Sequence, residues 1–216
     1  MTTPIRVLVL EDRPADAELI ELELRRAGFE LDWTRVDSKK DFLANLSEDL
    51  DIILSDYSMP QFDALRALSL LQETGLDIPL IVVTGSFEAQ AIECMKQGAA
   101  DYLIKDRLGR LGPAVSQAIQ ERTLRREKRK VEQALRESEA RFRSVAESAV
   151  DGLVLVDDNG EIGYWNPAAE QIFGYPEEEM LGQRLALLLA GQDRERFEAG
   201  IESFKPGGEP LPLGRR

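Results

Sequence analysis

Residues 52–60 read Ile-Ile-Leu-Ser-Asp-Tyr-Ser-Met-Pro, a short apolar run that passes into polar and turn-forming residues. Its first residues are large and aliphatic, as expected of a parallel strand that is buried on both faces. In open sheets of parallel strands, chemistry takes place at the carboxyl ends of the strands. Asp56, which follows the apolar run, is therefore a candidate site residue.

Similar runs occur on both sides of this one. Ile5–Leu10, Ile78–Val83 and Tyr102–Ile104 are short and rich in Val, Ile and Leu, and Glu30–Val36 is a weaker candidate strand. The segments between them carry apolar residues at the three- and four-residue spacings of amphipathic helices. Alternating strands and helices over residues 1–120 predict an α/β fold with a doubly wound, five-stranded parallel sheet.

Polar residues follow four of the predicted strands and would meet at one edge of the sheet. Carboxylates come after the first and third strands, a threonine after the fourth and a lysine after the fifth: Glu11, Asp12, Asp56, Thr84 and Lys105. Carboxylates in one pocket repel one another unless a cation neutralises them, and oxygen ligands favour Mg²⁺. A carboxylate beside such a cation and a lysine is suited to attack a phosphoryl group. The simpler alternative is that the acidic residues only cap helices.

The composition excludes several classes of function. With 40 acidic and 27 basic residues the net charge is −13, which disfavours binding to a nucleic-acid backbone. The chain has no histidine, so these residues hold no His-based triad and no phosphorylated histidine. A single cysteine, Cys94, excludes an internal disulfide. No signal peptide or membrane span is evident, and we expect a cytoplasmic protein without membrane contact.

Residues 107–148 contain no strand pattern and predict a long helix, interrupted near Gly109, Gly112 and Pro113. Over the linker at 121–143 we expect a coiled coil that forms a homodimer. The alternative is a single solvated helix with acidic and basic residues paired along it. We expect its basic side chains to face solvent rather than nucleic acid. Apolar or small residues recur at alternating spacings near four and three, at Leu124, Val131, Leu135, Ser138, Phe142, Val145 and Ala149.

The pattern changes again in residues 144–216. Gly152–Val156 and Ile162–Trp165 read as two strands around Asn159-Gly160, a strong hairpin signal. Short helices are predicted after the hairpin, and the remainder reads as loop. The predicted helices are Pro167–Phe173, Pro176–Leu181 and Asp193–Phe204, and the predicted loop covers Pro206–Pro212.

The motifs of residues 1–120 together resemble those of a response-regulator receiver domain, which has a flavodoxin-like fold. They are the acidic pair Glu11-Asp12, then Asp56 followed by Tyr-Ser-Met-Pro, then Thr84, and Ala-Asp-Tyr-Leu-Ile-Lys ending at Lys105. The resemblance implies that Asp56 is the phosphoacceptor and that a histidine kinase or a phosphotransfer protein supplies the phosphoryl group.

The same resemblance implies roles for the other motif residues. Mg²⁺ or Mn²⁺ would be held by Glu11, Asp12, Asp56 and the backbone carbonyl of Ser58. Lys105 would pair with the phosphoryl group, and Thr84 would move to hydrogen-bond it. Tyr102 would be an aromatic switch that turns inward when Thr84 moves.

Residues 139–204 resemble the amino-terminal part of a PAS sensor domain. The matching motifs are Ser-Glu-Ala-Arg-Phe-Arg-Ser-Val, Gly-Leu-Val-Leu-Val-Asp and Tyr-Trp-Asn-Pro-Ala-Ala-Glu. A PAS fold needs a five-stranded sheet, and two strands are found, so we expect a truncated α+β domain that is partly disordered or completed by another chain. No PAS ligand is identifiable, and Trp165, Phe173 and Tyr175 read as core aromatics.

These inferences predict a phosphorelay protein in which the state of Asp56 passes through the helix to the PAS module. We expect no enzyme in the chain itself; any output enzyme, such as a histidine kinase or a diguanylate cyclase, would lie outside it. One alternative is a degenerate receiver that serves as a dimerisation module. Another is an aspartate-dependent phosphatase, which would want a second Asp where this chain has Ser58.

Overall fold

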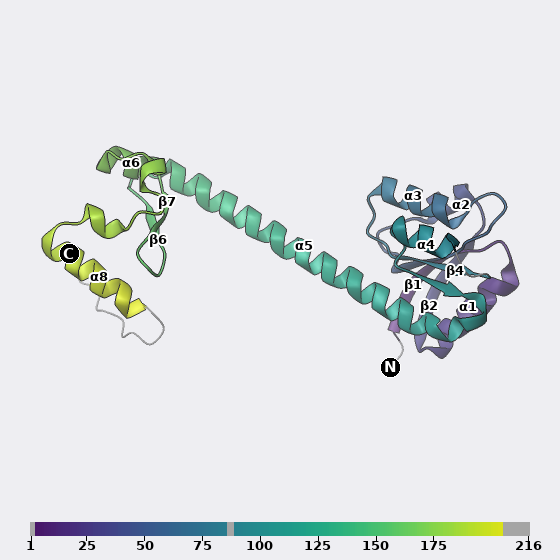
Figure 1. Ribbon diagram of the computed structural model, residues 1–216. Helices are drawn as coiled ribbons and strands as arrows, with labels where there is room; N and C mark the ends of the chain where they lie inside the picture. The colour runs from purple at the N-terminus through teal and green to yellow at the C-terminus, as the bar shows by residue number, and fades with distance from the viewer. Residues whose placement is uncertain (1–2, 86–88, 205–216) are drawn as a thin grey trace. The chain divides into compact units, whose positions relative to one another are not determined.

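A computed structural model of the chain describes residues 3–85 and 89–204, and the predicted loop over Pro206–Pro212 lies outside them. The chain divides into two compact units, with the division between Lys130 and Val131 (Figure 1). In the described part of the chain, no helix is both long enough and apolar enough to cross a membrane.

The first unit is built on a five-stranded parallel sheet with the order β2-β1-β3-β4-β5, which confirms the predicted doubly wound fold. This is the strand order of flavodoxin-like sheets. The strands are β1 (Thr3–Leu10), β2 (Phe29–Val36), β3 (Ile52–Asp56), β4 (Leu80–Thr84) and β5 (Asp101–Ile104). The helices between them are α1 (Pro14–Arg26), α2 (Lys39–Asn45), α3 (Ala64–Thr74) and α4 (Ala89–Lys96).

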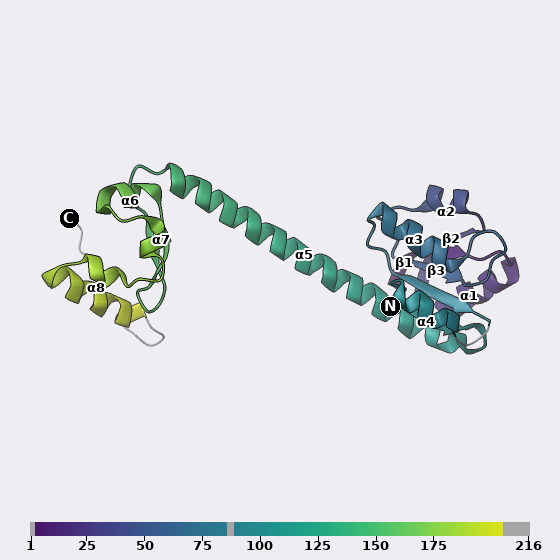
Figure 2. The ribbon, with the colours of Figure 1, turned by 45° about the horizontal axis from the view of Figure 1, so that its top comes forward.

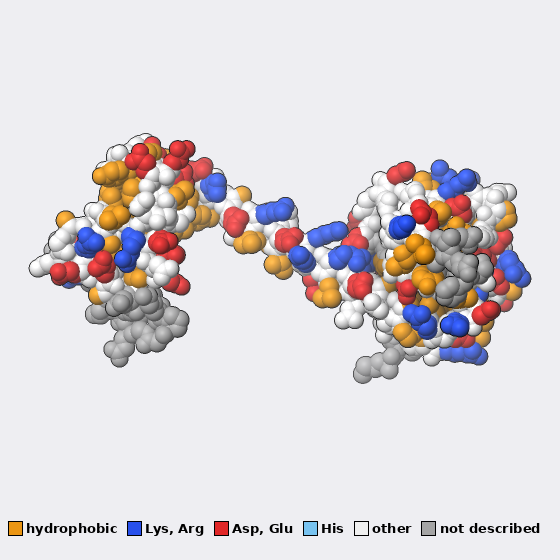
Figure 3. Space-filling model, viewed as in Figure 1, with side chains coloured by type: hydrophobic (Ala, Val, Ile, Leu, Met, Phe, Trp, Pro, Cys, Tyr) orange, Lys and Arg blue, Asp and Glu red, His pale blue; other side chains and the backbone are white. Residues whose placement is uncertain are grey.

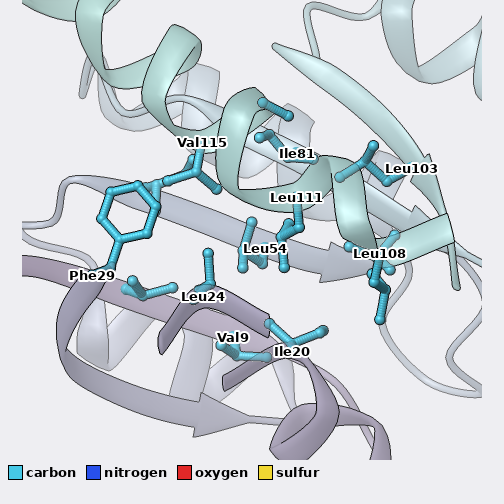
Figure 4. Close-up of a cluster of buried hydrophobic side chains, with 14 of the residues drawn as sticks. Val9, Ile20, Leu24, Phe29, Leu54, Ile81, Leu103, Leu108, Leu111 and Val115 are labelled. Carbon is cyan, nitrogen blue, oxygen red and sulfur yellow. The ribbon is translucent and has the colours of Figure 1, made fainter. Parts of the chain in front are cut away.

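Alternating side chains of the strands build one hydrophobic core on each face of the sheet. On one face Val9 and Leu54 pack against α1 and the start of α5 (Figure 4). On the other face Leu8, Leu10 and Ile53 pack against α2, α3 and α4 (Figure 1, Figure 2). Because successive side chains of a strand point to opposite faces, continuous apolar runs such as Ile52–Leu54 supply both cores.

After β5 the chain forms a 3-10 turn, η1 (Lys105–Arg110), and then the helix α5 (Leu111–Ser148) of 38 residues. The predicted interruption near Gly109 therefore lies in η1, whereas Gly112 and Pro113 belong to the first turn of α5. Proline is tolerated there because the first backbone N–H groups of a helix have no partner within the helix. Gly112 allows a close approach, since a Cβ atom at this position would overlap that of Ala27.

Arg122 fastens α5 to the loop that leads into β3. Its side chain is buried, and its guanidinium donates to the backbone carbonyls of Leu50, of Asp51 at 3.2 Å and of Glu48 at 3.2 Å. One turn further along α5, Arg125 pairs with Asp77, which lies in the loop before β4, at 3.1 Å. A basic residue in a charged helix suggests a solvated side chain, but this one is an internal hydrogen-bond donor.

The second unit contains a two-stranded antiparallel sheet of β6 (Val154–Val156) and β7 (Ile162–Trp165), as the hairpin signal predicts. Asp157 stabilises the turn because its carboxylate accepts hydrogen bonds from the backbone N–H groups of Asn159 and Glu161. A small core surrounds Trp165, whereas Phe173 and Tyr175 are exposed, so the prediction of core aromatics is confirmed for Trp165 alone. The remaining elements are α6 (Pro167–Phe173), α7 (Glu177–Met180), η2 (Leu185–Leu188) and α8 (Gly191–Phe204).

The Arg122 contacts generate a stability prediction. Replacing Arg122 by Met keeps most of the aliphatic volume but leaves buried carbonyl groups without a donor, so we expect the free energy of unfolding to fall by about 2 kcal/mol. Urea unfolding followed by circular dichroism measures the change. The control is Arg136→Met, an exposed arginine on the same helix, for which a change of no more than about 0.5 kcal/mol is expected. Equal losses in the two variants would contradict the anchoring role of Arg122.

Candidate functional site

The candidate site lies at the carboxyl edge of the parallel sheet. Glu11 directly follows β1, Asp56 and Thr84 end β3 and β4, and Lys105 directly follows β5. The register supports this convergence, since Asp56 is aligned with Val83 and Thr84 with Ile104. The strand order places β3 beside both β1 and β4. The fold thus brings together polar side chains that are up to 94 residues apart in the sequence.

Three carboxylates form a cluster that suits a divalent cation. Glu11, Asp12 and Asp56 each offer an oxygen atom, and these atoms all lie within 4.8 Å of one another. Glu11 is fully buried and Asp56 is 8% exposed, whereas Asp12 is exposed to solvent. Burial raises the pKa of Glu11 above its usual value, and the nearby Asp56 charge adds to this effect. Such a set of oxygen ligands with like charge fits Mg²⁺ or Mn²⁺.

Ser58 lies beside the cluster but is exposed. Its backbone N–H donates to Oδ1 of Asp56 at 3.4 Å, a long hydrogen bond that fixes the loop after β3 close to the carboxylate. The structure therefore places the backbone N–H of Ser58 beside Asp56, and the ligand role expected of the Ser58 carbonyl stays a prediction.

Lys105 supplies positive charge to this acidic pocket. Its ammonium nitrogen lies 2.8 Å from Oε2 of Glu11, 3.1 Å from Oδ2 of Asp56 and 2.7 Å from Oδ2 of Asp16. Burial by itself lowers the pKa of Lys105, but the hydrogen bonds that the ammonium donates to these carboxylates outweigh it and raise that pKa well above its ordinary value. The lysine is therefore charged at every physiological pH.

Asp16 is a member of the site that the sequence analysis missed. It lies in the first turn of α1, where an acidic residue is commonplace because it favours the helix dipole. The hydrogen bond from Lys105 holds the pKa of Asp16 below its usual value. A usable signal is its position four residues after Asp12, since α1 begins at the same sheet edge as the acidic pair.

Thr84 and Tyr102 lie on neighbouring strands and on the same face of the sheet. Thr84 is buried at the end of β4, and Tyr102 is half-buried on β5, aligned with Val82. Because side chains two residues apart on a strand share a face, Val82 and Thr84 point the same way, and so does Tyr102. This arrangement places the two predicted switch residues on one face of the sheet, two register positions apart on adjacent strands.

Comparison with known families assigns the first unit. The family model described as the response regulator receiver domain matches residues 7–116. The chain belongs to this receiver family. A second model, that of the PAS fold, matches residues 140–210, so the receiver domain is followed by a PAS module. Both resemblances seen in the sequence are thereby confirmed.

Known relatives of this receiver protein are signalling proteins. It is 33% identical over 88 residues to the sensor protein FixL of Bradyrhizobium diazoefficiens, covering 41% of this chain and 17% of FixL. It is 31% identical over 102 residues to the cell cycle transcriptional regulator CtrA of Caulobacter vibrioides, covering 47% of this chain and 44% of CtrA. The chain therefore spans less than half the length of either relative.

A solved receiver structure shows the same fold. The signal receiver domain from Vibrio parahaemolyticus has a TM-score of 0.50 and 20% sequence identity, and the match covers 56% of this chain and 95% of that one. This likeness shows the fold, whereas the family model and the relatives place the receiver in two-component, phosphorelay signalling.

Replacing Lys105 by Met tests the electrostatics of the pocket. Without the Lys105 ammonium, the charge of Asp56 acts on the buried Glu11 with no lysine charge to offset it. We therefore expect the pKa of Glu11 to rise further. A carboxyl group whose pKa is higher in the folded than in the unfolded protein stabilises the fold as the pH falls through that higher value. The variant should therefore lose about 1–3 kcal/mol of unfolding free energy at pH 8 and less at pH 5.

Urea unfolding at the two pH values measures both numbers. Lys40→Met, at an exposed position, is the matched control and should leave the pH dependence unchanged. A Lys105→Met variant as stable as the wild type at pH 8 would show that the pocket does not need this charge.

Proposed function

We propose that the receiver accepts a phosphoryl group on Asp56 from a histidine kinase or a phosphotransfer protein in the cytoplasm, and passes the change of state through α5 to the PAS module. The observation that carries this proposal is the environment of the Asp56 carboxylate. It belongs to the cation-binding cluster and also contacts Lys105 at 3.1 Å, so a transferred phosphoryl group would meet positive charge on two sides.

These contacts support the following reaction. A carboxylate oxygen of Asp56 attacks the phosphorus atom, the bond from phosphorus to the donor nitrogen breaks, and that nitrogen keeps the electron pair and takes a proton. Glu11, Asp12, Asp56 and the Ser58 carbonyl would hold Mg²⁺ or Mn²⁺, which neutralises charge on the phosphoryl oxygens. Lys105 stabilises the same charge from the side of β5.

Thr84 and Tyr102 would report the phosphorylated state. In this proposal the Thr84 hydroxyl moves to donate a hydrogen bond to a phosphoryl oxygen, and Tyr102 on the same face of the sheet turns inward into the vacated space. Phosphorylation then acts as a local charge that selects between two arrangements of the domain.

The helix α5 is fastened at both ends by buried polar side chains. At the receiver end, Arg122 binds the carbonyl groups before β3. At the PAS end, the buried Asn166 donates to the carbonyls of Ala146 at 2.9 Å and Asp151 at 3.0 Å. Its oxygen accepts from the backbone N–H groups of Leu153 and Ala169.

An aromatic contact adds to the attachment at the PAS end. Phe142 of α5 meets Tyr164 of β7 edge to face, with ring centroids 5.2 Å apart. We therefore propose a receiver over 1–120, a helical linker over 121–143 and a PAS module over 144–216, with α5 as the element that connects the phosphorylation site to the sensor module.

A second copy of the chain is the proposed partner of α5. Apolar side chains along this helix are exposed among acidic and basic ones (Figure 3). Leu124, Val131 and Leu135 are each more than half exposed and recur at spacings of seven and four, as in a coiled-coil seam. Pairing with the same seam of another chain would remove this apolar surface from water.

Phosphorylation is tested with a small phosphodonor and Mg²⁺. The wild type should gain the mass of one phosphoryl group, in a form that hydroxylamine removes, and peptide mapping should place it at Asp56. We expect no gain in Asp56→Asn or after chelation of Mg²⁺. Asp32→Asn, at an exposed position on β2, is the control and should react as the wild type does. Equal phosphorylation of wild type and Asp56→Asn would refute the proposal.

Dimerisation is tested separately by sedimentation velocity. Replacing Leu135 by Asp puts charge into the seam, so we expect the dimer to dissociate at least about tenfold more readily. Ala134→Asp introduces the same charge at an exposed neighbouring position off the seam and should leave the dimer intact. A wild-type chain that remains monomeric at high concentration would contradict the seam.

A further inference from the structure

The contact between Lys105 and Asp16 differs in kind from the other two contacts of this lysine. Glu11 and Asp56 belong to the carboxylate cluster that fits a divalent cation, and Asp16 does not. Yet the Asp16 contact, at 2.7 Å, is shorter than the 2.8 Å contact with Glu11 and the 3.1 Å contact with Asp56. The structure thus gives Lys105 one acceptor that neither cation binding nor phosphorylation engages.

The number of hydrogen atoms on the ammonium makes this distinction important. Lys105 has three N–H donors, and its three carboxylate acceptors are Glu11, Asp16 and Asp56. A cation bound by Glu11 and Asp56 takes up electron pairs of those two carboxylates. A lysine that depended on them alone would then compete with the cation or move away.

We propose that Asp16 is a positioning residue that holds the ammonium group of Lys105 at the phosphoacceptor edge while the carboxylate cluster binds its cation. This inference rests on the proposed function, because it assigns Asp16 a role in the same phosphotransfer. In the cation-bound protein, Lys105 keeps its bond to Asp16 and turns its remaining donors toward the phosphoryl oxygens. Asp16 acts through the lysine and does not touch the phosphoryl group.

A purely structural role for Asp16 is the main competing explanation. The residue lies in the first turn of α1, where a negative charge favours the helix, and its carboxylate lies 3.6 Å from the guanidinium of Arg13. Arg13 is largely exposed, so this ion pair is weak. A structural role predicts the same effect of removing Asp16 whether or not Lys105 is present, whereas a positioning role predicts an effect that depends on Lys105.

A double-mutant cycle on the full chain separates the two explanations. The four proteins are the wild type, Asp16→Ala, Lys105→Ala and the double variant, and calorimetry measures the dissociation constant of Mg²⁺ alone for each. Loss of the Asp16 charge weakens cation binding somewhat in either background. We expect the weakening to be at least about threefold greater when Lys105 is present. Without Asp16, the lysine donates only to the metal-binding carboxylates and competes with the cation for them.

The rate of phosphorylation by a small phosphodonor gives a second readout. Asp16→Ala should slow it about tenfold, the size of effect commonly seen when one charge-assisted hydrogen bond is removed. Glu18→Ala removes the same charge from an exposed position on the same helix and should leave both readouts unchanged. If Asp16→Ala lowers the thermal midpoint, Asp16→Asn replaces it, since the amide keeps the shape and removes the charge.

The outcomes separate the two proposals. A wild-type chain that takes no phosphoryl group on Asp56 overturns the proposed function and the role of Asp16 with it. A wild type that is phosphorylated on Asp56, with equal loss of Mg²⁺ affinity in both backgrounds, overturns the role of Asp16 alone. A rate for Asp16→Ala equal to that of the wild type does the same.

Discussion

Repulsion between carboxylates at the end of the sheet is the constraint on which the site depends. Glu11 is fully buried and Asp56 nearly so, and like charges at this separation repel more strongly inside a protein than in water. The arrangement is stable because Lys105, which follows the edge strand β5, contacts both carboxylates. The site therefore needs β1, β3 and β5 in their observed order, and its electrostatics are a property of the whole sheet.

The strand β3 has a different task at each end. Its carboxyl end carries Asp56, and the loop before its first residue offers carbonyl groups to the buried Arg122 of α5. Five residues of extended chain separate these ends, about 16 Å. Both cores pack against this strand, and it leads directly from the acidic pocket to the loop that binds Arg122 of the linker helix.

Much of the fold could be predicted because the parallel strands are short apolar runs that end in polar residues. The same reasoning found Glu11, Asp12, Asp56, Thr84 and Lys105, since chemistry at a parallel sheet collects at strand ends. It missed Asp16 because this residue belongs to a helix, where an acidic first turn is ordinary. Its contact with Lys105 depends on tertiary packing, and the spacing from Asp12 indicates only that Asp16 lies near the same edge of the sheet.

Other features were hidden for similar reasons. Arg122 stands in a charged segment whose composition favours solvated side chains, and only the approach of α5 to the loop before β3 buries it. Gly112 and Pro113 suggest the end of a helix, but they lie at the start of α5. The backbone N–H groups of that first turn have no hydrogen-bond partner within the helix, so a proline costs nothing there. In each case a neighbouring element decided the environment of the side chain.

Asn166 has a consequence for how finely the PAS attachment can respond. Its amide uses both hydrogens as donors and its oxygen accepts twice, so the side chain that joins the end of α5, the hairpin and α6 has no unused bonding capacity. Loosening any one bond leaves a buried polar group unpaired, at a cost of about 1–3 kcal/mol, several times the thermal energy. An attachment of this kind resists small displacements of the helix. It changes only when a displacement is large enough to exchange several of its hydrogen bonds at once.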